Sequence, residues 1–322
     1  MKGTIRQAAS RWYFGPKVWS LHCGISRRTA AALARVSHPM ALTRDLPDSF
    51  AEAIVEHYQP EDKDAASSPV SISVARQQHE QYGQALRDLG VCTVSLPAQP
   101  TLPDSLFVED TAVVVQHNFG GDQKETRAVL MNPGHKDRQP EVDDVAAVLE
   151  KLLALGGCKL ERMQALDEKA FGDGGDVLYT GRHLFVGVAE QMDDHLARTN
   201  VRAVAVLEKV LDPLPVLPVV LNTESRRIPV LHLKSAITHM DAHTLVAPAA
   251  PWTHRLLRQM RVHELGYQVL RIPDVLACNV VVLPDHKGLL LQDTPCAESR
   301  AVLQQAADER GLPYRWVDTS EL

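Results

Sequence analysis

Two short acidic stretches contain the residues whose types and spacing are best suited to chemistry. In the first, Asp104, Glu109 and Asp110 lie at or inside the start of an apolar, β-branched run. Carboxylates are costly to bury unless a cation meets them. The second is Asp173-Gly-Gly-Asp176, whose glycines permit close approach by a ligand. Taken alone, the first stretch is explained by a solvent-exposed strand start and the second by an ordinary acidic turn. The two together predict a cationic ligand that both stretches contact.

One histidine and two arginines supply groups for proton transfer and charge pairing. His232 is a polar residue within the apolar run 230–235. An imidazole there is either a structural group or a proton donor to a leaving amine. Arg138 and Arg198 each precede a predicted helix, where an arginine is either surface charge or a ligand contact. Composition alone leaves these alternatives open.

A metal site is not predicted. His239 and His243 have the spacing of a metal-binding pair on a helix. Their segment has the pattern of a hairpin turn, however, and no third ligand is evident. The chain is therefore expected to use neither a metal nor another cofactor.

Composition and charge exclude several classes of protein. The 322-residue chain has a hydrophobic content of 45% and a formal net charge of -6. Neither nucleic acid nor an anionic membrane surface is an expected partner of such a chain, and no apolar run approaches the ~20 residues that a membrane helix needs. Five scattered cysteines without CxxC spacing argue for a reducing compartment and against a disulfide framework. The sequence leaves the oligomeric state open.

The first 44 residues differ in charge from the rest of the chain. They contain eight lysines and arginines and no acid. An Arg-rich, acid-free N-terminus fits an organellar transit peptide, while a disordered extension or a start of translation at Met40 explains the same composition. Residues 1–40 are therefore left out of the predicted fold. The expected location is cytoplasmic, or mitochondrial or otherwise organellar if residues 1–40 are a transit peptide.

Beyond this extension, a helix that ends at a glycine and then a short strand recur along the chain. Predicted helices cover residues 73–89, 141–155, 252–265 and 297–310, with a further one near 198–210. Strands follow at 91–96, 268–272 and 314–317.

Between the helices lie paired apolar runs that are typical of hairpins. They cover residues 104–130, 176–186, 236–246 and 279–291, and their first polar residues are Asp104, Asp176, Ser235 and Asn279. Asp104 and Asp110 would share one face of an extended strand. The repetition predicts a single domain, residues 41–322, built as a ring of hairpin-plus-helix modules whose strand starts converge on the axis.

Several motifs, taken in this order, resemble the dimethylarginine dimethylaminohydrolase family, a branch of the amidinotransferase-like, guanidine-modifying enzymes. They are Leu-Pro-Asp104 followed by Phe-Val-Glu-Asp110, Asp173-Gly-Gly-Asp176-Val-Leu-Tyr-Thr-Gly-Arg, and Leu-His232-Leu-Lys-Ser235. The similarity runs from about Met40 to Leu322. It implies an α/β fold, the five-bladed α/β propeller called the pentein fold, and a methylated guanidinium as the cationic ligand.

The resemblance also implies an activity and its residues. The implied reaction hydrolyses Nω-methylated arginines to citrulline and methylamines. The implied catalytic residues are His232, the general acid/base, and Asp173, which together with Asp104 holds the guanidinium nitrogens. Arg138 and Arg198 would clamp the α-carboxylate of the substrate. The full set of implied substrate contacts is Asp104, Glu109, Asp110, Arg138, Arg198 and Ser235.

The chain departs from the family at the nucleophile. The family's nucleophilic cysteine lies close to the C-terminus, after a region similar to Trp316–Leu322. None of the five cysteines matches that position, and Cys278 and Cys296 are expected to be structural thiols. The sequence therefore predicts a hydrolase fold that lacks its nucleophile and whose ring is incompletely closed at the C-terminus. The alternatives are a non-catalytic methylarginine-binding protein and a related arginine deiminase or amidinotransferase.

Overall fold

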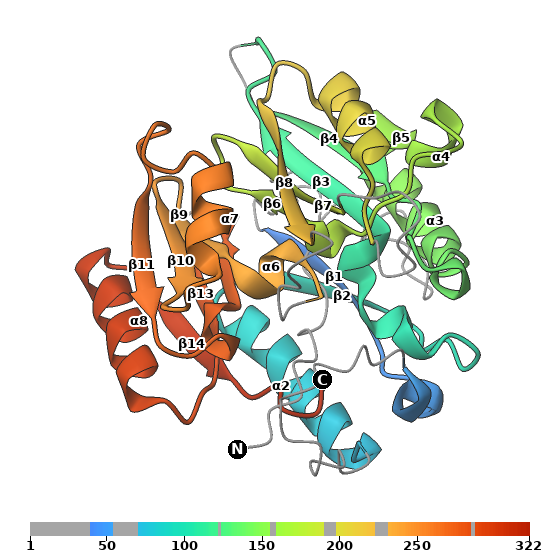
Figure 1. The fold of residues 1–322 in the computed structure, drawn as a ribbon. Helices are drawn as coiled ribbons and strands as arrows, with labels where there is room; N and C mark the ends of the chain where they lie inside the picture. The colour runs from blue at the N-terminus through green and yellow to red at the C-terminus, as the bar shows by residue number, and fades with distance from the viewer. Residues whose placement is uncertain are drawn as a thin grey trace.

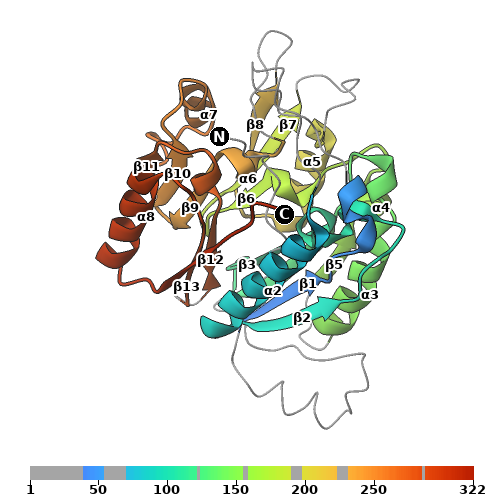
Figure 2. The same ribbon diagram turned by 90° about the horizontal axis from the view of Figure 1, so that it is seen from below.

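The strands of this protein form five small sheets around a common centre (Figures 1 and 2). The computed structural model describes residues 39–53, 70–121, 124–154, 159–189, 198–222, 231–284 and 287–322. Four sheets contain three strands each, and the fifth contains two. Residues 1–38 lie outside the described residues, so the alternatives for the N-terminal extension, the cellular location and the 41–322 domain boundary stay predictions.

Each three-stranded sheet follows one plan, which we call a module. A short helical turn leads into an antiparallel hairpin, and a helix then connects to a third strand that runs parallel to the second. Module 1 contains η3 (Val108–Thr111), β3 (Ala112–His117), β4 (Glu125–Leu130), α3 (Glu141–Ala154) and β5 (Lys159–Arg162). Module 2 contains η5 (Gly174–Asp176), β6 (Val177–Tyr179), β7 (Leu184–Ala189), α5 (Val201–Leu211) and β8 (Val216–Asn222).

The next two modules repeat the same order. Module 3 contains α6 (Leu233–Ala236), β9 (Thr238–Asp241), β10 (Thr244–Pro248), α7 (Thr253–Gln259) and β11 (Gln268–Ile272). Module 4 contains η6 (Leu276–Cys278), β12 (Val280–Leu283), β13 (Gly288–Gln292), α8 (Ala297–Glu309) and β14 (Tyr314–Val317). The remaining short helices are η1 (Asp48–Glu52), η2 (Pro103–Leu106), η4 (Lys136–Arg138) and α4 (Met163–Leu166).

Module 5 is the two-stranded sheet. It pairs β1 (Met40–Arg44) in parallel with β2 (Cys92–Leu96), and α2 (Ile72–Asp88) belongs to the connection between them. Among the described strands, β1 pairs with β2 alone. The prediction of an incompletely closed ring concerns this sheet, and it remains a prediction.

The ends of several helices follow directly from glycines in the sequence. After α2 the chain turns at Gly90, which has φ 77°, and after α8 it turns at Gly311, which has φ 62°. These left-handed conformations favour glycine because it has no Cβ. The helix predicted at 252–265 is too long, because α7 ends at Gln259 and Arg261 then adopts φ 52°.

The first acidic stretch lies on helical turns and not on a strand. Pro103 opens η2, and the amides of Ser105 and Phe107 donate to carbonyls three residues earlier, at 3.1 and 2.9 Å. The strand β3 begins only at Ala112. The prediction that Asp104 and Asp110 share one face of a strand is therefore wrong, because proline at the first position favours a tight turn over an extended segment.

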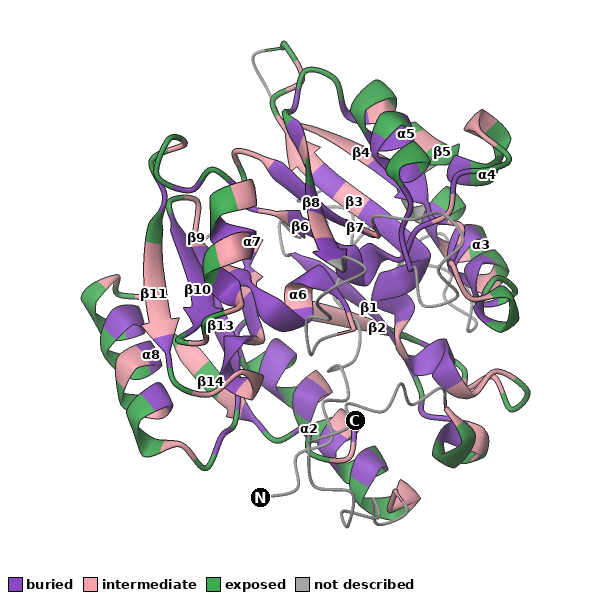
Figure 3. Cartoon of the chain, in the orientation of Figure 1, coloured by how far each residue is buried: buried purple, intermediate pink, exposed green. Residues whose placement is uncertain are grey.

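Buried strands fill the middle of the ring, and helices with exposed outer faces surround them (Figure 3). The inner turns of successive modules meet, since η3 contacts η5, η5 contacts α6, and α6 contacts η6. Module 5 contacts module 4 through α2 and β14, and module 1 through β1 and η3. The predicted arrangement of hairpin-plus-helix modules, with their strand starts at the centre, is confirmed. No helix among the described residues is long and apolar enough to cross a bilayer.

Candidate functional site

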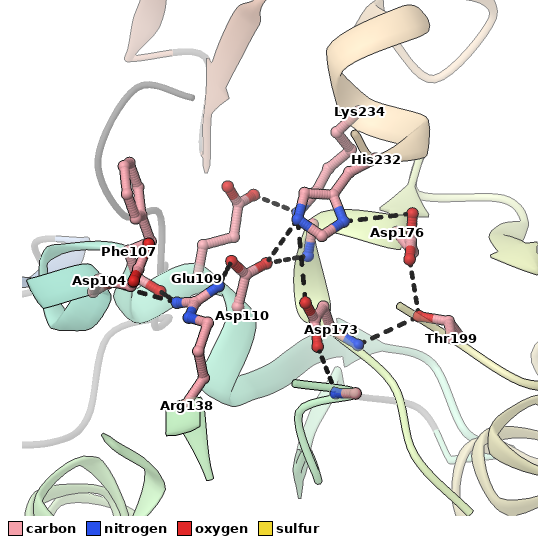
Figure 4. Close-up of polar contacts among 12 residues, drawn as sticks. Asp104, Phe107, Glu109, Asp110, Arg138, Asp173, Asp176, Thr199, His232 and Lys234 are labelled. Carbon is pink, nitrogen blue, oxygen red and sulfur yellow. Dashed lines mark hydrogen bonds and ion pairs between the residues drawn. The ribbon is translucent and has the colours of Figure 1, made fainter. Parts of the chain in front are cut away.

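The candidate site lies where the inner turns of modules 1, 2 and 3 meet (Figure 4). Asp110 comes from η3, Asp173 and Asp176 lie at the two ends of the η5 turn, and His232 precedes α6. All four side chains are buried. The structure thus brings together residues that are separated by more than 100 positions in the sequence, as the predicted convergence of strand starts requires.

His232 is surrounded by three carboxylates. Its Nε2 atom lies 3.8 Å from Oδ1 of Asp110 and 3.9 Å from Oδ2 of Asp173, and its Nδ1 atom lies 3.4 Å from Oδ1 of Asp176. Burial alone would lower the pKa of the imidazole, but the three carboxylates favour its charged form and raise the pKa to about 9. His232 therefore carries a proton at neutral pH and can act as an acid.

Two glycines allow this close packing. A Cβ atom on Gly175 would lie 2.7 Å from Oδ1 of Asp110 and 2.8 Å from Cδ2 of His232. A Cβ atom on Gly174 would lie 2.0 Å from the carbonyl oxygen of Glu109. Glycine is therefore required at both positions. The turn of module 2 that contains them packs so closely against modules 1 and 3 that it leaves no room for a side chain.

Asp110 is held as an anion by its surroundings. Its Oδ2 atom accepts a hydrogen bond from Nη1 of Arg138 at 2.6 Å, and its Oδ1 atom accepts one from the amide of Gly175 at 2.7 Å. Burial would raise the pKa of Asp110, but the charges of His232 and Arg138 and these hydrogen bonds lower it to about 2. The carboxylate is therefore ionised at any physiological pH.

Arg138 is buried between two acids. Besides Asp110, it donates to Glu141 through Nε at 3.2 Å and Nη2 at 2.8 Å. Nη2 also donates to the carbonyls of Asp104 and Phe107, each at 3.3 Å. Burial raises the pKa of Glu141 to about 7, against the charge of Arg138. Arg138 lies at the site, where its guanidinium binds protein groups, and its predicted role as a clamp on the substrate α-carboxylate stays a prediction.

The two carboxylate oxygens of Asp173 have different surroundings. Its Oδ1 atom accepts a hydrogen bond from the amide of Gly134 at 2.9 Å, whereas its Oδ2 atom is buried and receives no hydrogen bond from the described residues. Burial and the charge of Asp110 raise the pKa of Asp173 to about 6, and nearby cations, Arg198 among them, oppose this rise. Arg198 is itself buried at the same site.

The other predicted contacts lie at the edge of this cluster. Glu109 is ion-paired with Lys234, which follows His232 by two residues. Asp104 is buried on η2 beside Arg138, and Ser235 is buried on α6. The backbone amide of Ser235 donates to the carbonyl of His232 at 3.1 Å, and Nη2 of Arg138 donates to the carbonyl of Asp104. These are backbone contacts, so the roles of the Asp104 and Ser235 side chains in binding stay predictions.

Two residues at the site were not assigned a role from the sequence. Asp176, the second acid of the Asp-Gly-Gly-Asp stretch, faces Nδ1 of His232. Lys234 neutralises Glu109. Asp176 could have been found from its place in the acidic stretch, whereas nothing in the sequence signals the pairing of Lys234 with a residue 125 positions away.

The same cluster has the spacing of a small cation site. One ligand atom each from Asp110, Asp173 and His232 lies within 4.8 Å of the others. A protonated His232 has no free nitrogen lone pair to offer a metal, however, and the positive charges of Arg138 and Arg198 act on Asp173. A planar organic cation matches two carboxylates as well as a metal does. We therefore assign no metal to these residues.

None of the cysteines that the structure describes lies within hydrogen-bonding reach of His232. Cys92 is in β2, Cys278 is in η6, and Cys296 precedes α8. Cys278 is packed in the core of module 4, where burial and the neighbouring Asp274 carboxylate raise its thiol pKa well above the ordinary value. It is therefore an uncharged core thiol.

Comparison of the sequence with known proteins gives a consistent set of relatives. A Bos taurus protein with the provisional name hydrolase DDAH2 is 31% identical over 300 residues, which cover 90% of this chain and 90% of that protein. An N(G),N(G)-dimethylarginine dimethylaminohydrolase of Streptomyces coelicolor is 30% identical over 255 residues, which cover 79% of this chain and 83% of that protein. No protein-family model matches the chain.

Solved structures show the same fold. A dimethylarginine dimethylaminohydrolase of Pseudomonas aeruginosa in complex with citrulline has a TM-score of 0.63 and 22% identity, covering 88% of this chain and 92% of that one. The N-terminal domain of ArgZ, a cyanobacterial arginine dihydrolase bound to its substrate, has a TM-score of 0.63 and 17% identity, covering 88% of this chain and 92% of that one. These similarities confirm the α/β propeller of the pentein type that the sequence predicted.

Proposed function

Since the chain belongs to the dimethylarginine dimethylaminohydrolase family, we propose that it hydrolyses Nω-methylated arginines, both asymmetric dimethylarginine and monomethylarginine, to citrulline and methylamines. The observation that carries this proposal is the buried meeting of Asp110, Asp173 and His232. The Streptomyces coelicolor relative is named for this activity, and the Pseudomonas aeruginosa enzyme binds citrulline.

The cluster has the groups that this reaction requires. A guanidinium carbon is a poor electrophile, so its plane must be held in a fixed orientation. The carboxylates of Asp110 and Asp173 orient such a cation through hydrogen bonds to its nitrogens. His232 is protonated at neutral pH, because its pKa is raised to about 9, and it donates that proton to the departing amine.

The two arginines take different parts in this proposal. Arg198 lies near Asp173 and is the group that we assign to the α-carboxylate of the substrate. The Nε, Nη1 and Nη2 atoms of Arg138 all donate to protein groups, so we assign to Arg138 the task of holding Asp110. Asp104, Glu109 and Ser235 complete the predicted contacts around the substrate.

Incubation with asymmetric dimethylarginine tests the proposal. We expect citrulline and dimethylamine in equal amounts, measured by mass spectrometry, and loss of both products in His232→Gln. Attack by a thiol is the chemistry that the family resemblance implies. Intact mass measured after acid quenching will therefore show an added substrate less dimethylamine, bound through its guanidinium carbon, and peptide mapping will identify the residue that carries it. Attack of water on this carbon then releases citrulline and restores the thiol. Release of neither product, without binding by calorimetry, would refute the proposal.

A methylarginine-binding protein without turnover is the second candidate. One observation favours it: the described residues place no cysteine beside His232. The same experiment separates the two candidates. Binding of asymmetric dimethylarginine by calorimetry, together with no dimethylamine above the buffer blank after prolonged incubation, would support the binding protein.

A further inference from the structure

Thr199 lies at the point where two separate parts of the site are joined. It is buried between Arg198 and Asn200, in the segment that leads into α5. Its backbone carbonyl accepts a hydrogen bond from Ala189 at the end of β7 at 3.1 Å. The next residue, Asn200, caps α5 through its side chain, which accepts from the amide of Ala203 at 3.1 Å. The backbone at Thr199 is therefore anchored on both sides.

The hydroxyl of Thr199 links the two acids of the Asp-Gly-Gly-Asp stretch. Its Oγ1 atom accepts a hydrogen bond from the amide of Asp173 at 3.1 Å and donates one to Oδ2 of Asp176 at 2.7 Å (Figure 4). The other oxygen of Asp176 accepts from the amide of Leu233 at 3.0 Å and faces Nδ1 of His232 at 3.4 Å. A single hydroxyl thus fixes the carboxylate that contacts the imidazole.

Packing determines which way this hydroxyl points. The methyl group of Thr199 lies against Gly172, where a Cβ atom would come within 3.0 Å of it. On the far side of Asp176, a Cβ atom on Gly187 would lie 3.1 Å from Oδ1. With the methyl directed to Gly172, the hydroxyl is directed to Asp173 and Asp176.

We propose that Thr199 is a positioning residue, which holds Asp176 so that His232 keeps its proton on Nδ1 and directs Nε2 at the substrate. The inference rests on the proposed function only for the role of His232 as proton donor. When the imidazole is neutral, the carboxylate of Asp176 stabilises the tautomer that carries hydrogen on Nδ1. Nε2 is then the atom that gives up and regains the proton, and it faces Asp110 and Asp173.

Replacement of Thr199 by valine or serine separates the hydroxyl from the rest of the side chain. Thr199→Val keeps the shape and removes both hydrogen bonds. Thr199→Ser keeps the hydroxyl and removes the methyl. The readout is the nitrogen NMR spectrum of the His232 ring, identified by the signals that disappear in His232→Gln. Titration of this ring requires neither a ligand nor turnover, so a failure of the proposed hydrolysis leaves the result intact.

The charged groups that face His232 determine the expected titration. Asp110 from η3 and Asp173 and Asp176 from η5 face the ring, and Lys234 on its own helix is paired with Glu109. In wild type and Thr199→Ser, we expect the neutral ring to carry hydrogen on Nδ1 alone. In Thr199→Val, we expect a mixture of both tautomers and a midpoint lower by on the order of one pH unit, because Asp176 is no longer held against the ring.

Two outcomes would overturn the inference. The first is that the His232 ring of Thr199→Val has the same titration midpoint and the same neutral tautomer as in wild type. Thr199 would then have a purely structural role, even if the melting temperature of the variant fell. The second is a shifted titration in Thr199→Ser, which would show that the methyl and not the hydroxyl matters. If Thr199→Val does not fold, Thr199→Ala, with a smaller side chain, makes the same comparison with the serine variant.

Discussion

Oδ2 of Asp173 lies 3.9 Å from Nε2 of His232, and both atoms are buried without a hydrogen bond within the part of the chain that the structure describes. Buried polar atoms in native proteins are nearly always paired, so an unpaired couple requires an explanation. A ligand that donates to Asp173 and receives a proton from His232 explains both atoms. A methylated guanidinium has nitrogens for both interactions.

Removing the charge of Asp173 tests the first half of this explanation. We expect Asp173→Asn to weaken binding of asymmetric dimethylarginine by on the order of 2–3 kcal/mol, because a buried cation loses a charged partner. Isothermal titration calorimetry measures the change. The matched control is Asp143→Asn, which alters an exposed acid on α3. Equal affinities for wild type and Asp173→Asn would remove Asp173 from the binding site.

The raised pKa of His232 makes stability depend on pH in a defined direction. The pKa is 6.5 for an unperturbed histidine and about 9 in the folded protein. The protonated ring therefore stabilises the fold fully below pH 6.5, and this contribution is lost as the pH rises through 9. We expect the free energy of unfolding to fall by on the order of 3 kcal/mol more in wild type than in His232→Gln between these values.

Urea denaturation of both proteins at pH 6.5 and at pH 9.5 measures this difference. The variant serves as the reference for all other titrating groups. Parallel pH profiles for the two proteins would mean that the three carboxylates do not raise the pKa of His232 in the folded state.

The buried position of Arg138 predicts a large effect on stability. Arg138→Met leaves the carboxylates of Asp110 and Glu141 buried without their cation, which costs about 3–5 kcal/mol. Arg162→Met is the control, because Arg162 forms ion pairs with Asp143 and Glu150 at the surface, and we expect a loss of about 0–1 kcal/mol. Chemical denaturation measures both, and similar losses for the two variants would contradict the burial of the Arg138 charge cluster.

Gly175 is the position where the smallest added side chain disturbs the site most. A methyl group there would overlap Oδ1 of Asp110 and the ring of His232, so Gly175→Ala is expected to destabilise the protein by about 1–3 kcal/mol and to abolish binding of methylarginine. Gly121→Ala is the control, since none of the described residues outside its chain neighbours lies within 4 Å of its added Cβ atom. Thermal unfolding and calorimetry of both variants provide the measurement, and unimpaired binding by Gly175→Ala would mean that Asp110 and His232 do not form the site.

The modular fold could be predicted from the sequence because each module repeats a local pattern. Strands β11 and β14 have the predicted bounds, Gln268–Ile272 and Tyr314–Val317. Each lies in a short run that follows a glycine after the preceding helix, and such runs are specified by nearby residues. A polar residue occurs at the start of each hairpin. This repetition was enough to predict that the starts of the hairpins converge on the axis of the ring.

Contacts between residues of different modules could not be predicted from the sequence. The sequence does single out Asp110, Asp173 and His232 as candidate site residues. Burying an acid or a histidine beside apolar strands costs free energy, so such residues need a partner. The role of Thr199 depends on a hydrogen bond to Asp176, 23 positions away, and threonine is common in any loop. The acids at 104–110 were wrongly placed on a strand because the apolar run after them has the pattern of a strand, while the turn is formed by Pro103 and backbone hydrogen bonds.

The position of the guanidinium beside Asp110, Asp173 and His232 is the central claim, and a crystal structure with asymmetric dimethylarginine, or with citrulline if turnover occurs, tests it most directly. The predicted result is a guanidinium or ureido nitrogen within about 3.2 Å of Oδ2 of Asp173, with the reacting carbon facing Nε2 of His232. A ligand whose guanidinium or ureido group contacts neither Asp110 nor Asp173 would contradict the account.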